Sequence, residues 1–363
     1  MQTAAQAPTD TRTTTPTQRR TATATATPSP TPTPAPLGFN PLTGEIVPDP
    51  ALLAHRPLAV KIVNEPACAR PQYGLEQAAV VFEHYVEAWG TRFTAIFYGY
   101  EAGRIGAIRS ARLVDLELPA IFDAGLVTSG SSSGVRLRLE QAEFADRVIA
   151  FQWQHQCPPL CLVPIETVPC ADIEHTLFTD LTDLRAAAQE MGFDQSPNLS
   201  GWEFDSVPPL KGQPAASVRV GYLNSPVDWR YEPENGSYHR WQDGVRHVAA
   251  ETRRRLTARN VVVLFAHHLY TDIRESPNFY SLEIQFWGQG PALIFRDGLA
   301  NPATWVRSER EGLFQLLDGA GNPIPLKPGR TWFEFVALDS PVAVAGDAWT
   351  ITAAVLPQQT PPR

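Results

Sequence analysis

Short β-prone segments separated by tight-turn sequences fill the chain from residue 217 onward. Asn235-Gly236, Asp243-Gly244 and Asp297-Gly298 lie between such segments, and glycine in these pairs supplies the positive φ that hairpin turns need. Regular turns of this kind indicate a compact sheet, a sandwich or a partial barrel. We therefore predict a β-rich C-terminal domain over residues 215–357. Its predicted strands are Ser217–Leu223, Trp229–Tyr231, Ser237–Trp241, Asn260–His267, Ser281–Trp287, Ala292–Arg296, Thr304–Ser308, Phe314–Leu317, Trp332–Ala337 and Trp349–Val355.

Residues 40–193 mix strand and helix patterns. Leu58–Asn64 and Gly125–Thr128 are predicted as buried strands, and Val135–Ala150 as a helix. A further helix should follow Thr179 or Asp180, either of which can cap it, and end before Gly192. These patterns predict an α+β fold, with an α/β-like N-terminal domain at residues 40–193. A linker rich in Pro, Ser and Gly at residues 194–214 is predicted to join it to the β-rich domain.

Threonine, proline and alanine dominate residues 1–39, and we predict a disordered tether there. Thr/Pro tracts are typical of stalks between a membrane anchor and an outside domain, so an extracytoplasmic location is expected. A disordered tail without a role is the alternative. The sequence holds no run of about 18 apolar residues, so membrane contact is expected only through an N-terminal anchor that the sequence does not show. Residues 358–363 are predicted as a disordered tail.

The charge balance argues against one class of partner. The formal net charge is −8 at pH 7, whereas nucleic-acid-binding proteins usually carry a basic surplus. We therefore expect no nucleic-acid partner. No motif in the chain indicates a cofactor, and none is predicted. His267 and His268 would point to opposite faces of a strand, so they are not expected to chelate a metal together.

The four cysteines, Cys68, Cys157, Cys161 and Cys170, indicate two disulfides in an exported chain. Three connectivities are possible, and we predict that a Cys157–Cys170 or Cys161–Cys170 bond closes the proline-rich loop. Zinc bound with His155 is the alternative, but a matching downstream ligand pair is missing. No metal site is therefore predicted.

Two strand-like segments, Val80–Ala88 and Thr91–Gly99, flank Trp89-Gly90 and predict a hairpin. A two-residue loop would place Glu87 opposite Arg92, with Glu83 on the same face and His84 on the apolar face. We expect His84 to be a hydrogen-bonded core histidine. The Cα atoms of Glu83 and Glu87 would lie about 13 Å apart, beyond the roughly 5–9.5 Å of glycosidase carboxylate pairs.

Arginines and hydroxyls gather around this hairpin in the sequence. Arginine presents a planar fork that suits carboxylate or phosphate, and Ser110 could begin a helix at Ala111 and offer free N–H groups. Internal ion pairs are the alternative use of these side chains. The predicted ligand-binding residues are Arg70, Arg109, Ser110, Arg112, Ser129 and Ser131, with Glu83, Glu87, Thr91 and Arg92 as their supports.

Gly130–Gly134 matches the G-x-S-x-G pattern of a nucleophile elbow, with Ser132 as its serine. The pattern follows a predicted strand and precedes a predicted helix, as an elbow requires. No later Asp and His stand out as partners, although Asp172 and His175 exist. No catalytic residue is therefore predicted, and a hydrolase using Ser132 remains the alternative.

Several ordered motifs resemble the family of YerB-like lipoproteins. They are Ala69–Leu75, Glu87–Arg92, Ile108–Arg112, Thr257–Val263, Gly290–Gly298 and Leu326–Trp332, and the match extends roughly from Asn40 to Val336. The resemblance implies a lipid-anchored, exported bacterial protein with two consecutive domains of unknown function, and it implies no activity. The lipid-bearing cysteine of such proteins is absent before the tether, and Ala107 stands where the motif leads us to expect proline.

Together these features predict a membrane-tethered, extracytoplasmic protein of the cell envelope, for which binding without catalysis is favoured over an enzymatic role. The arginine-rich face is expected to bind an anionic envelope ligand, either a glycan, a peptidoglycan fragment or a peptide, or a partner protein. A purely structural scaffold is a further alternative. Aromatic residues of the second domain would suit sugar stacking if exposed, but burial is their expected state. They are Trp229, Tyr231, Tyr238, Trp241, Trp287, Trp305 and Trp332.

Overall fold

The computed structural model describes residues 37–152, 157–197, 199–209 and 211–355. The predicted C-terminal tail and nearly all of the predicted tether lie outside these residues, as does His155. The last residues assigned to the tether are described, and Phe39 forms a β-bridge with Ile46. The described residues belong to one compact unit.

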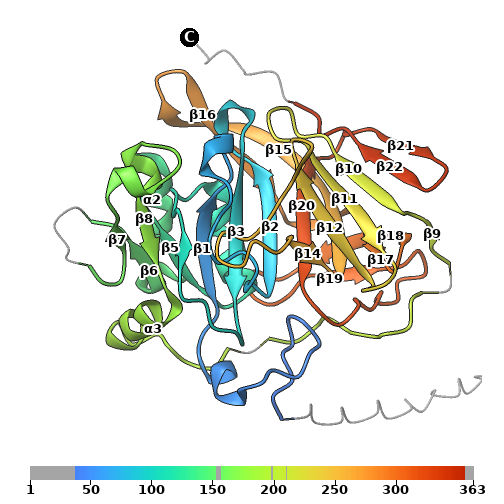
Figure 1. Cartoon of the computed structure of the whole chain (residues 1–363), viewed down its shortest axis with the longest axis horizontal. Coiled ribbons are helices and arrows are strands. Elements are labelled where there is room, and N and C mark those ends of the chain that lie inside the picture. The colour runs from blue at the N-terminus through green and yellow to red at the C-terminus, as the bar shows by residue number, and fades with distance from the viewer. Residues whose placement is uncertain (1–36, 153–156, 198, 210, 356–363) are drawn as a thin grey trace, which may run out of the picture. The chain divides into compact units, whose positions relative to one another are not determined.

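A long mixed sheet runs through this unit (Figure 1). Its strands are β1 (Leu58–Val63), β2 (Val80–Tyr85), β3 (Thr91–Phe97), β5 (Gly125–Thr128), β6 (Val148–Ala150), β9 (Gln213–Pro214), β15 (Asn260–Ser276), β16 (Phe279–Gln285), β17 (Gly288–Arg296), β18 (Leu299–Arg307), β19 (Gln315–Leu317) and β20 (Thr331–Ala337). The order is β19-β18-β17-β15-β20-β2-β3-β1-β5-β6, with β16 on β15 and β9 on β18.

The N-terminal and C-terminal parts of the chain meet within this sheet. β20 pairs in parallel with β2 from Val80↔Thr331 to Glu83↔Glu334, and it pairs in parallel with β15 on its other side. Residues 194–214 therefore connect two chain segments that share a continuous sheet. Few helices and a β-rich C-terminal region confirm the predicted fold class.

Two smaller sheets complete the β-structure. One has the order β13-β12-β11-β10-β22-β21, with β14 on β12, and the other is β4-β8-β7. Their strands are β4 (Ile105–Gly106), β7 (Cys161–Leu162), β8 (Leu177–Thr179), β10 (Ser217–Val220), β11 (Val227–Glu232), β12 (Ser237–Gln242), β13 (Val245–Arg246), β14 (Thr257–Ala258), β21 (Val342–Ala345) and β22 (Ala348–Ile351).

The helices are short, and among the described residues none is long and apolar enough to cross a membrane. Asp180 caps α3 (Leu181–Glu190) by accepting a hydrogen bond from the Asp183 N–H at 2.8 Å, as predicted. The helix predicted to end at Ala150 ends at Leu139 instead, and the chain returns as β6. The helices are α1 (Leu118–Ile121), α2 (Ser133–Leu139), α3 (Leu181–Glu190) and the 3-10 turns η1 (Pro50–Ala54), η2 (Ala67–Ala69), η3 (Glu87–Trp89), η4 (Leu113–Leu116), η5 (Ala145–Arg147), η6 (Ile165–Thr167) and η7 (Ile173–His175).

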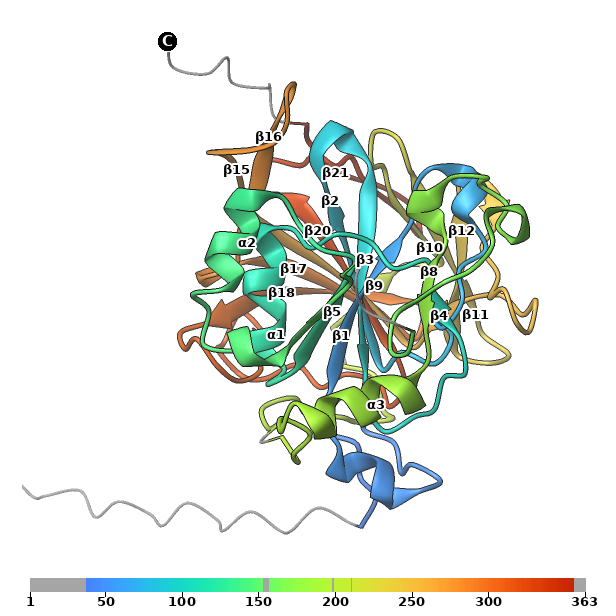
Figure 2. The ribbon, with the colours of Figure 1, turned by 90° about the vertical axis from the view of Figure 1, so that its left-hand side faces the viewer.

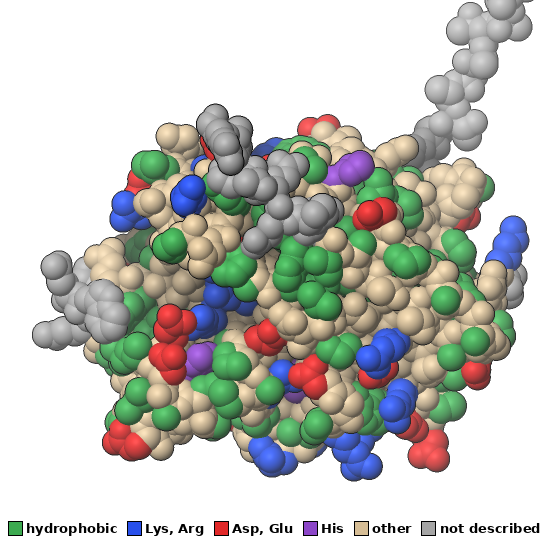
Figure 3. Space-filling view, turned by 90° about the horizontal axis from the view of Figure 1, so that it is seen from above, with side chains coloured by type: hydrophobic (Ala, Val, Ile, Leu, Met, Phe, Trp, Pro, Cys, Tyr) green, Lys and Arg blue, Asp and Glu red, His purple; other side chains and the backbone are tan. Residues whose placement is uncertain are grey.

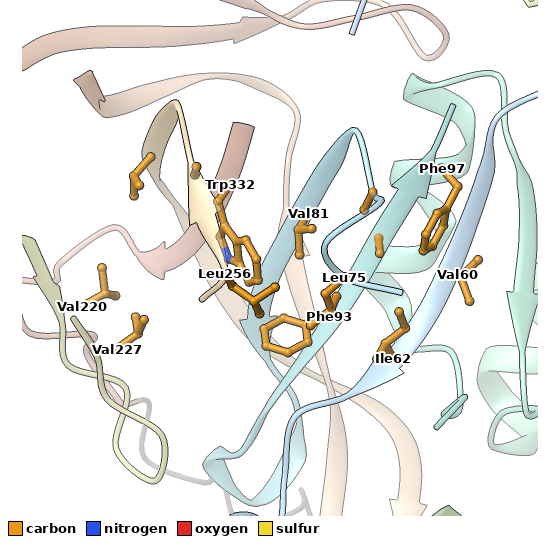
Figure 4. Close-up of a cluster of buried hydrophobic side chains, with 14 of the residues drawn as sticks. Val60, Ile62, Leu75, Val81, Phe93, Phe97, Val220, Val227, Leu256 and Trp332 are labelled. Atoms are coloured by element: carbon orange, nitrogen blue, oxygen red, sulfur yellow. The ribbon is translucent and has the colours of Figure 1, made fainter. Parts of the chain in front are cut away.

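Both faces of the long sheet are covered, as Figure 2 shows with α1 and α2 on one side and β10–β12 on the other. Side chains alternate between two apolar clusters, so Val60 and Ile62 belong to one and Ala59 to the other. Figure 4 shows the first cluster, in which Phe93, Trp332 and Leu256 lie close together. The Trp332 ring also packs against Trp229 of β11, with the ring centres 5.3 Å apart. Burial on both faces explains the continuous apolar segments in the sequence.

Most aromatics of the second part are buried, as predicted. Trp229 and Tyr238 are fully buried, and Trp305 and Trp332 nearly so. Trp287 differs, with 44% of its surface exposed. These rings therefore build the core and do not form a shared stacking surface.

Candidate functional site

The β2–β3 hairpin has a different register from the predicted one. Glu83 lies opposite Phe93, and His84 lies opposite Arg92. The predicted Glu87–Arg92 pair is wrong because the connection is not a two-residue loop. Glu87–Trp89 forms the 3-10 turn η3, with a φ of 64° at both Ala88 and Trp89. The altered register moves Arg92 onto the face of His84 and away from Glu83.

His84 belongs to a buried polar cluster with Lys61, Thr94 and Asp115. The Lys61 ammonium lies 2.7 Å from His84 Nε2, 3.0 Å from Thr94 Oγ1 and 2.8 Å from Asp115 Oδ2. The prediction of a hydrogen-bonded core histidine is therefore confirmed. Burial, together with the Lys61 charge, lowers the pKa of His84 to about 3. Burial also lowers the pKa of Lys61 to about 8, although Asp115 opposes this shift.

This buried cluster holds the Arg109–Arg112 segment in place. Asp115 Oδ2 accepts a hydrogen bond from the Arg112 N–H at 2.6 Å, and the Arg109 N–H donates to the Lys61 carbonyl at 3.0 Å. Sequence reasoning missed Lys61 and Asp115. A lysine within an apolar strand was the available signal, because a fully buried ammonium requires an acidic partner.

The anchored segment forms one wall of a pocket of about 300 Å³, which we call the Arg92 pocket. It combines a cationic and hydroxyl side with an apolar side. Ser110 Oγ and Ser129 Oγ lie 3.3 Å apart within it. On the face that Figure 3 shows, basic side chains lie beside acidic ones, including in a hollow of the surface. The pocket is lined by Arg92, Ile108, Arg109, Ser110, Arg112, Ser129, Phe151, Leu162, Ile173, Glu174 and Leu177.

The three arginines of this pocket differ in their partners. Arg112 forms an ion pair with Glu87, whose side chain is only 6% exposed. Arg109 forms one at 2.6 Å with Glu174, whose side chain is 61% exposed. Arg92 instead donates to the Ser110 carbonyl at 2.9 Å, and within the described ranges no carboxylate lies at ion-pair distance from it. Burial lowers the pKa of Arg92, and the charges of Arg112 and Arg109 lower it further.

Other predicted site residues lie elsewhere. Arg70 pairs with Asp243 at 2.6 Å. Glu83 is fully buried between the two sheets, where it accepts hydrogen bonds from Arg240 at 2.6 Å and from Thr91 at 2.7 Å. Ser131 does not line the Arg92 pocket. The structure thus brings together Arg109, Ser110, Arg112 and Ser129, and it adds Arg92, which had been predicted as a support.

Comparison with known proteins places this chain in a family. Two family patterns match in order, the "Protein of unknown function (DUF3048) N-terminal domain" at residues 42–194 and the "Protein of unknown function (DUF3048) C-terminal domain" at residues 217–333. The chain belongs to the DUF3048 family. It is 26% identical over 279 residues to the Bacillus subtilis protein named "Putative lipoprotein YerB", covering 74% of this chain and 77% of that protein.

The fold of a solved DUF3048 relative agrees with this one. The crystal structure of YerB from Bacillus subtilis superposes with a TM-score of 0.66 at 25% identity, covering 82% of this chain and 96% of the YerB chain. The resemblance noted in the sequence is therefore confirmed. It establishes the family and the architecture of this chain.

The N-terminal DUF3048 segment supplies every residue that lines the Arg92 pocket. The C-terminal segment supports it through Glu275 of β15. One Glu275 oxygen lies 3.8 Å from Arg112 Nε, and the other accepts a hydrogen bond from the Ser132 hydroxyl at 2.8 Å. Ser132 also caps α2 by accepting from the Val135 N–H. In the described part of this DUF3048 chain, no imidazole is among the hydrogen-bond partners of Ser132.

The four cysteines of this DUF3048 chain form two disulfides, as predicted, but the predicted pairing of Cys170 with Cys157 or Cys161 is wrong. The bonds are Cys68–Cys170 and Cys157–Cys161, because η2 brings Cys68 beside the proline-rich loop. All four cysteines are paired, so no thiolate is left for zinc. The Cys68–Cys170 bond fastens a segment that carries Leu162, Ile173 and Glu174 of the pocket lining.

Proposed function

We propose that this protein is a non-catalytic binding protein of the cell envelope that captures the carboxylate of a ligand at Arg92. One observation carries the proposal. Arg109 and Arg112 are each paired with a glutamate, whereas Arg92 lines the same pocket with only a carbonyl as its partner among the described residues. The pocket therefore holds one guanidinium charge in excess of the carboxylates paired with its arginines.

A carboxylate matches this excess in charge and in shape. It is planar and singly charged, and it can accept two parallel hydrogen bonds from one guanidinium. The Ser110 and Ser129 hydroxyls lie in the same pocket and can donate to a second oxygen or to a neighbouring carbonyl.

The apolar side of the pocket favours a peptide over a bare glycan. Leu162 and Ile173 are 41% and 49% exposed, which leaves aliphatic surface available to a ligand side chain. A sugar ring offers hydroxyls to such a wall, whereas a peptide offers methyl and methylene groups. The ligand class is thus a short peptide with a free carboxylate, alone or as part of a peptidoglycan fragment.

An extracytoplasmic location is part of the proposal. The relative at 26% identity is named "Putative lipoprotein YerB", and the Thr- and Pro-rich residues 1–36 have the composition of a stalk. Disulfides persist in oxidising compartments, and this chain has two. A membrane-held stalk would present the Arg92 pocket to the cell wall.

Isothermal titration with short aliphatic peptides tests the proposal. A peptide with a free C-terminal carboxylate should bind, and its C-terminal amide should bind at least tenfold more weakly. Arg92→Gln should weaken binding by about 10- to 150-fold, since hydrogen bonds to charged groups contribute ~1.5–3 kcal/mol. Arg138→Gln removes an exposed arginine of α2 outside the pocket and serves as the control. Equal affinities for Arg92→Gln and the unaltered protein would refute the proposal.

A further inference from the structure

A second basic pocket lies beside β12 and β14, which Figure 1 labels. Its volume is about 450 Å³, and it shares no residue with the Arg92 pocket. Arg259 and Arg330 of this pocket come from the motifs Thr257–Val263 and Leu326–Trp332. The proposed peptide binding at Arg92 assigns no role to these two motifs. The lining is Glu45, Asn235, Ser237, His239, Arg254, Arg255, Thr257, Arg259, Gly329 and Arg330.

Strand register brings Arg259 and Arg330 together. β15 and β20 run parallel with Asn260 opposite Thr331, so the residues immediately before them lie at the same end of adjacent strands. The Arg259 N–H donates to the Arg330 carbonyl at 2.9 Å. The two guanidinium-bearing residues are therefore fixed as neighbours by the backbone of the central sheet.

Most of the positive charge in this pocket is not neutralised. Arg254 forms an ion pair with Glu76 at 2.8 Å. For Arg255, Arg259 and Arg330, no carboxylate lies at ion-pair distance among the residues that the structure describes. The single acidic residue of the lining, Glu45, accepts a hydrogen bond from the Tyr100 hydroxyl at 2.7 Å.

The polar contacts of these three arginines leave donors free. Arg259 donates to the Asn235 carbonyl. Arg255 stacks on Trp241, with its guanidinium carbon 4.2 Å from the ring centre, and it contacts His239 Nδ1 at 3.4 Å. Arg330 Nε is buried and has no hydrogen-bond partner within the described ranges. Leaving a buried guanidinium N–H without a partner costs free energy, and an ordered water or a ligand oxygen would satisfy it.

The backbone is shaped to hold the Arg259 side chain. Gly329 has a φ of +129°, and a Cβ there would lie 2.1 Å from Arg259 Cγ. Only glycine combines that backbone angle with that close approach. The aliphatic part of the Arg259 side chain therefore packs directly against Gly329. This contact restricts the side chain before a ligand binds, so the ligand does not have to order the guanidinium.

We propose that this pocket binds the phosphate group of a small phosphate-bearing molecule. Three guanidiniums without carboxylate partners exceed what one carboxylate can neutralise. A phosphomonoester carries about −1.5 to −2 charges at pH 7 and three acceptor oxygens. Asn235, Ser237 and Thr257 add amide and hydroxyl groups for the polar remainder of the ligand.

Titration of the full protein with inorganic phosphate, glycerol 3-phosphate and acetate tests this proposal. Both phosphates should bind in this pocket, and acetate should not bind there. Tighter binding of glycerol 3-phosphate identifies an ester as the ligand, whereas equal binding identifies free phosphate. Chemical shifts of the His239 imidazole report occupancy of the pocket itself, because His239 lines it.

Arg259→Gln and Arg255→Gln should each weaken phosphate binding at least tenfold. Arg92→Gln and Arg138→Gln should leave it unchanged, so this proposal and the peptide-binding function fail independently. Arg255 does not adjoin the starts of β15 and β20. The Arg255→Gln variant therefore keeps the test valid if Arg259→Gln misfolds. Absence of millimolar phosphate binding, or its retention in both folded variants, would overturn the proposal.

Discussion

Arg112 holds Glu87, the carboxylate that the sequence had assigned to Arg92. Glu87 also accepts a hydrogen bond from the Leu282 N–H at 3.2 Å, so it ties η3 to β16 as well. The exchange of partners leaves Arg92 as the arginine of its pocket with no carboxylate among the described residues. Of the two arginine–glutamate pairs in the pocket, Arg109–Glu174 is the one that a ligand could displace, because Glu174 is more exposed than Glu87.

Glu174→Gln should strengthen carboxylate binding. The substitution removes the acid that competes for Arg109, and peptide affinity measured by calorimetry should rise several-fold. Stability should change by less than about 0.5 kcal/mol, because exposed ion pairs contribute little. Glu166→Gln alters another exposed acid of the same loop and should leave the affinity unchanged. Weaker binding by Glu174→Gln would mean that the glutamate orients Arg109 for the ligand.

Acid should destabilise the protein through His84. Its pKa is lowered from 6.5 to about 3 in the folded protein, so between these pH values the unfolded chain binds a proton that the folded protein does not. Stability is therefore lost as pH falls through this window, by about 2 kcal/mol between pH 7 and pH 5 from this group alone.

Urea unfolding at pH 7 and pH 5 measures this loss. His84→Asn should be less stable at pH 7 and should show a smaller difference between the two pH values. His267→Asn, which alters an exposed histidine, should keep the full difference. An unchanged pH dependence in His84→Asn would assign the acid sensitivity to other groups.

The two disulfides should differ in their effects. Cys68 and Cys170 are 102 residues apart, so replacing both by serine should cost about 2–5 kcal/mol of unfolding free energy. It should also weaken peptide binding, because the loop that carries Ile173 and Glu174 loses its fastening. The Cys157→Ser, Cys161→Ser double variant removes a bond across four residues and should cost less. Equal losses in thermal unfolding and in calorimetry would contradict this assignment.

Ser132→Ala should act on stability alone. Loss of the α2 cap should cost about 1 kcal/mol, measured by chemical denaturation. A serine-reactive fluorophosphonate should label the protein and the variant to the same extent, because Glu275 and the α2 backbone engage the hydroxyl. Labelling that disappears in Ser132→Ala would instead support a nucleophilic role.

Local signals in the sequence predicted much of the fold. The apolar segment at Leu58–Val63, the Asp180 cap of α3 and the turns of the second half depend on neighbouring residues alone. The register of the β2–β3 hairpin could not be predicted from local signals. Its positive φ angles fall on Ala88 and Trp89, residue types that carry no sequence signal for that conformation.

Contacts between distant residues limited prediction of the site. Arg109, Ser110 and Arg112 could be proposed from spacing and chemistry, but their acidic partners lie in other segments. The Cys68–Cys170 bond and the β2–β20 pairing likewise join residues far apart in sequence. Such pairings depend on the whole fold, so a single sequence leaves several of them equally possible.

The β2–β20 pairing has a consequence for any separate use of the two family segments. A fragment ending near residue 200 would lack β20 and expose the edge of β2, a strand whose six residues are all buried in the intact chain. Its free N–H and C=O groups would pair with the same edge of another copy. Such a fragment should self-associate, because β20 of the C-terminal segment covers that edge in the intact chain.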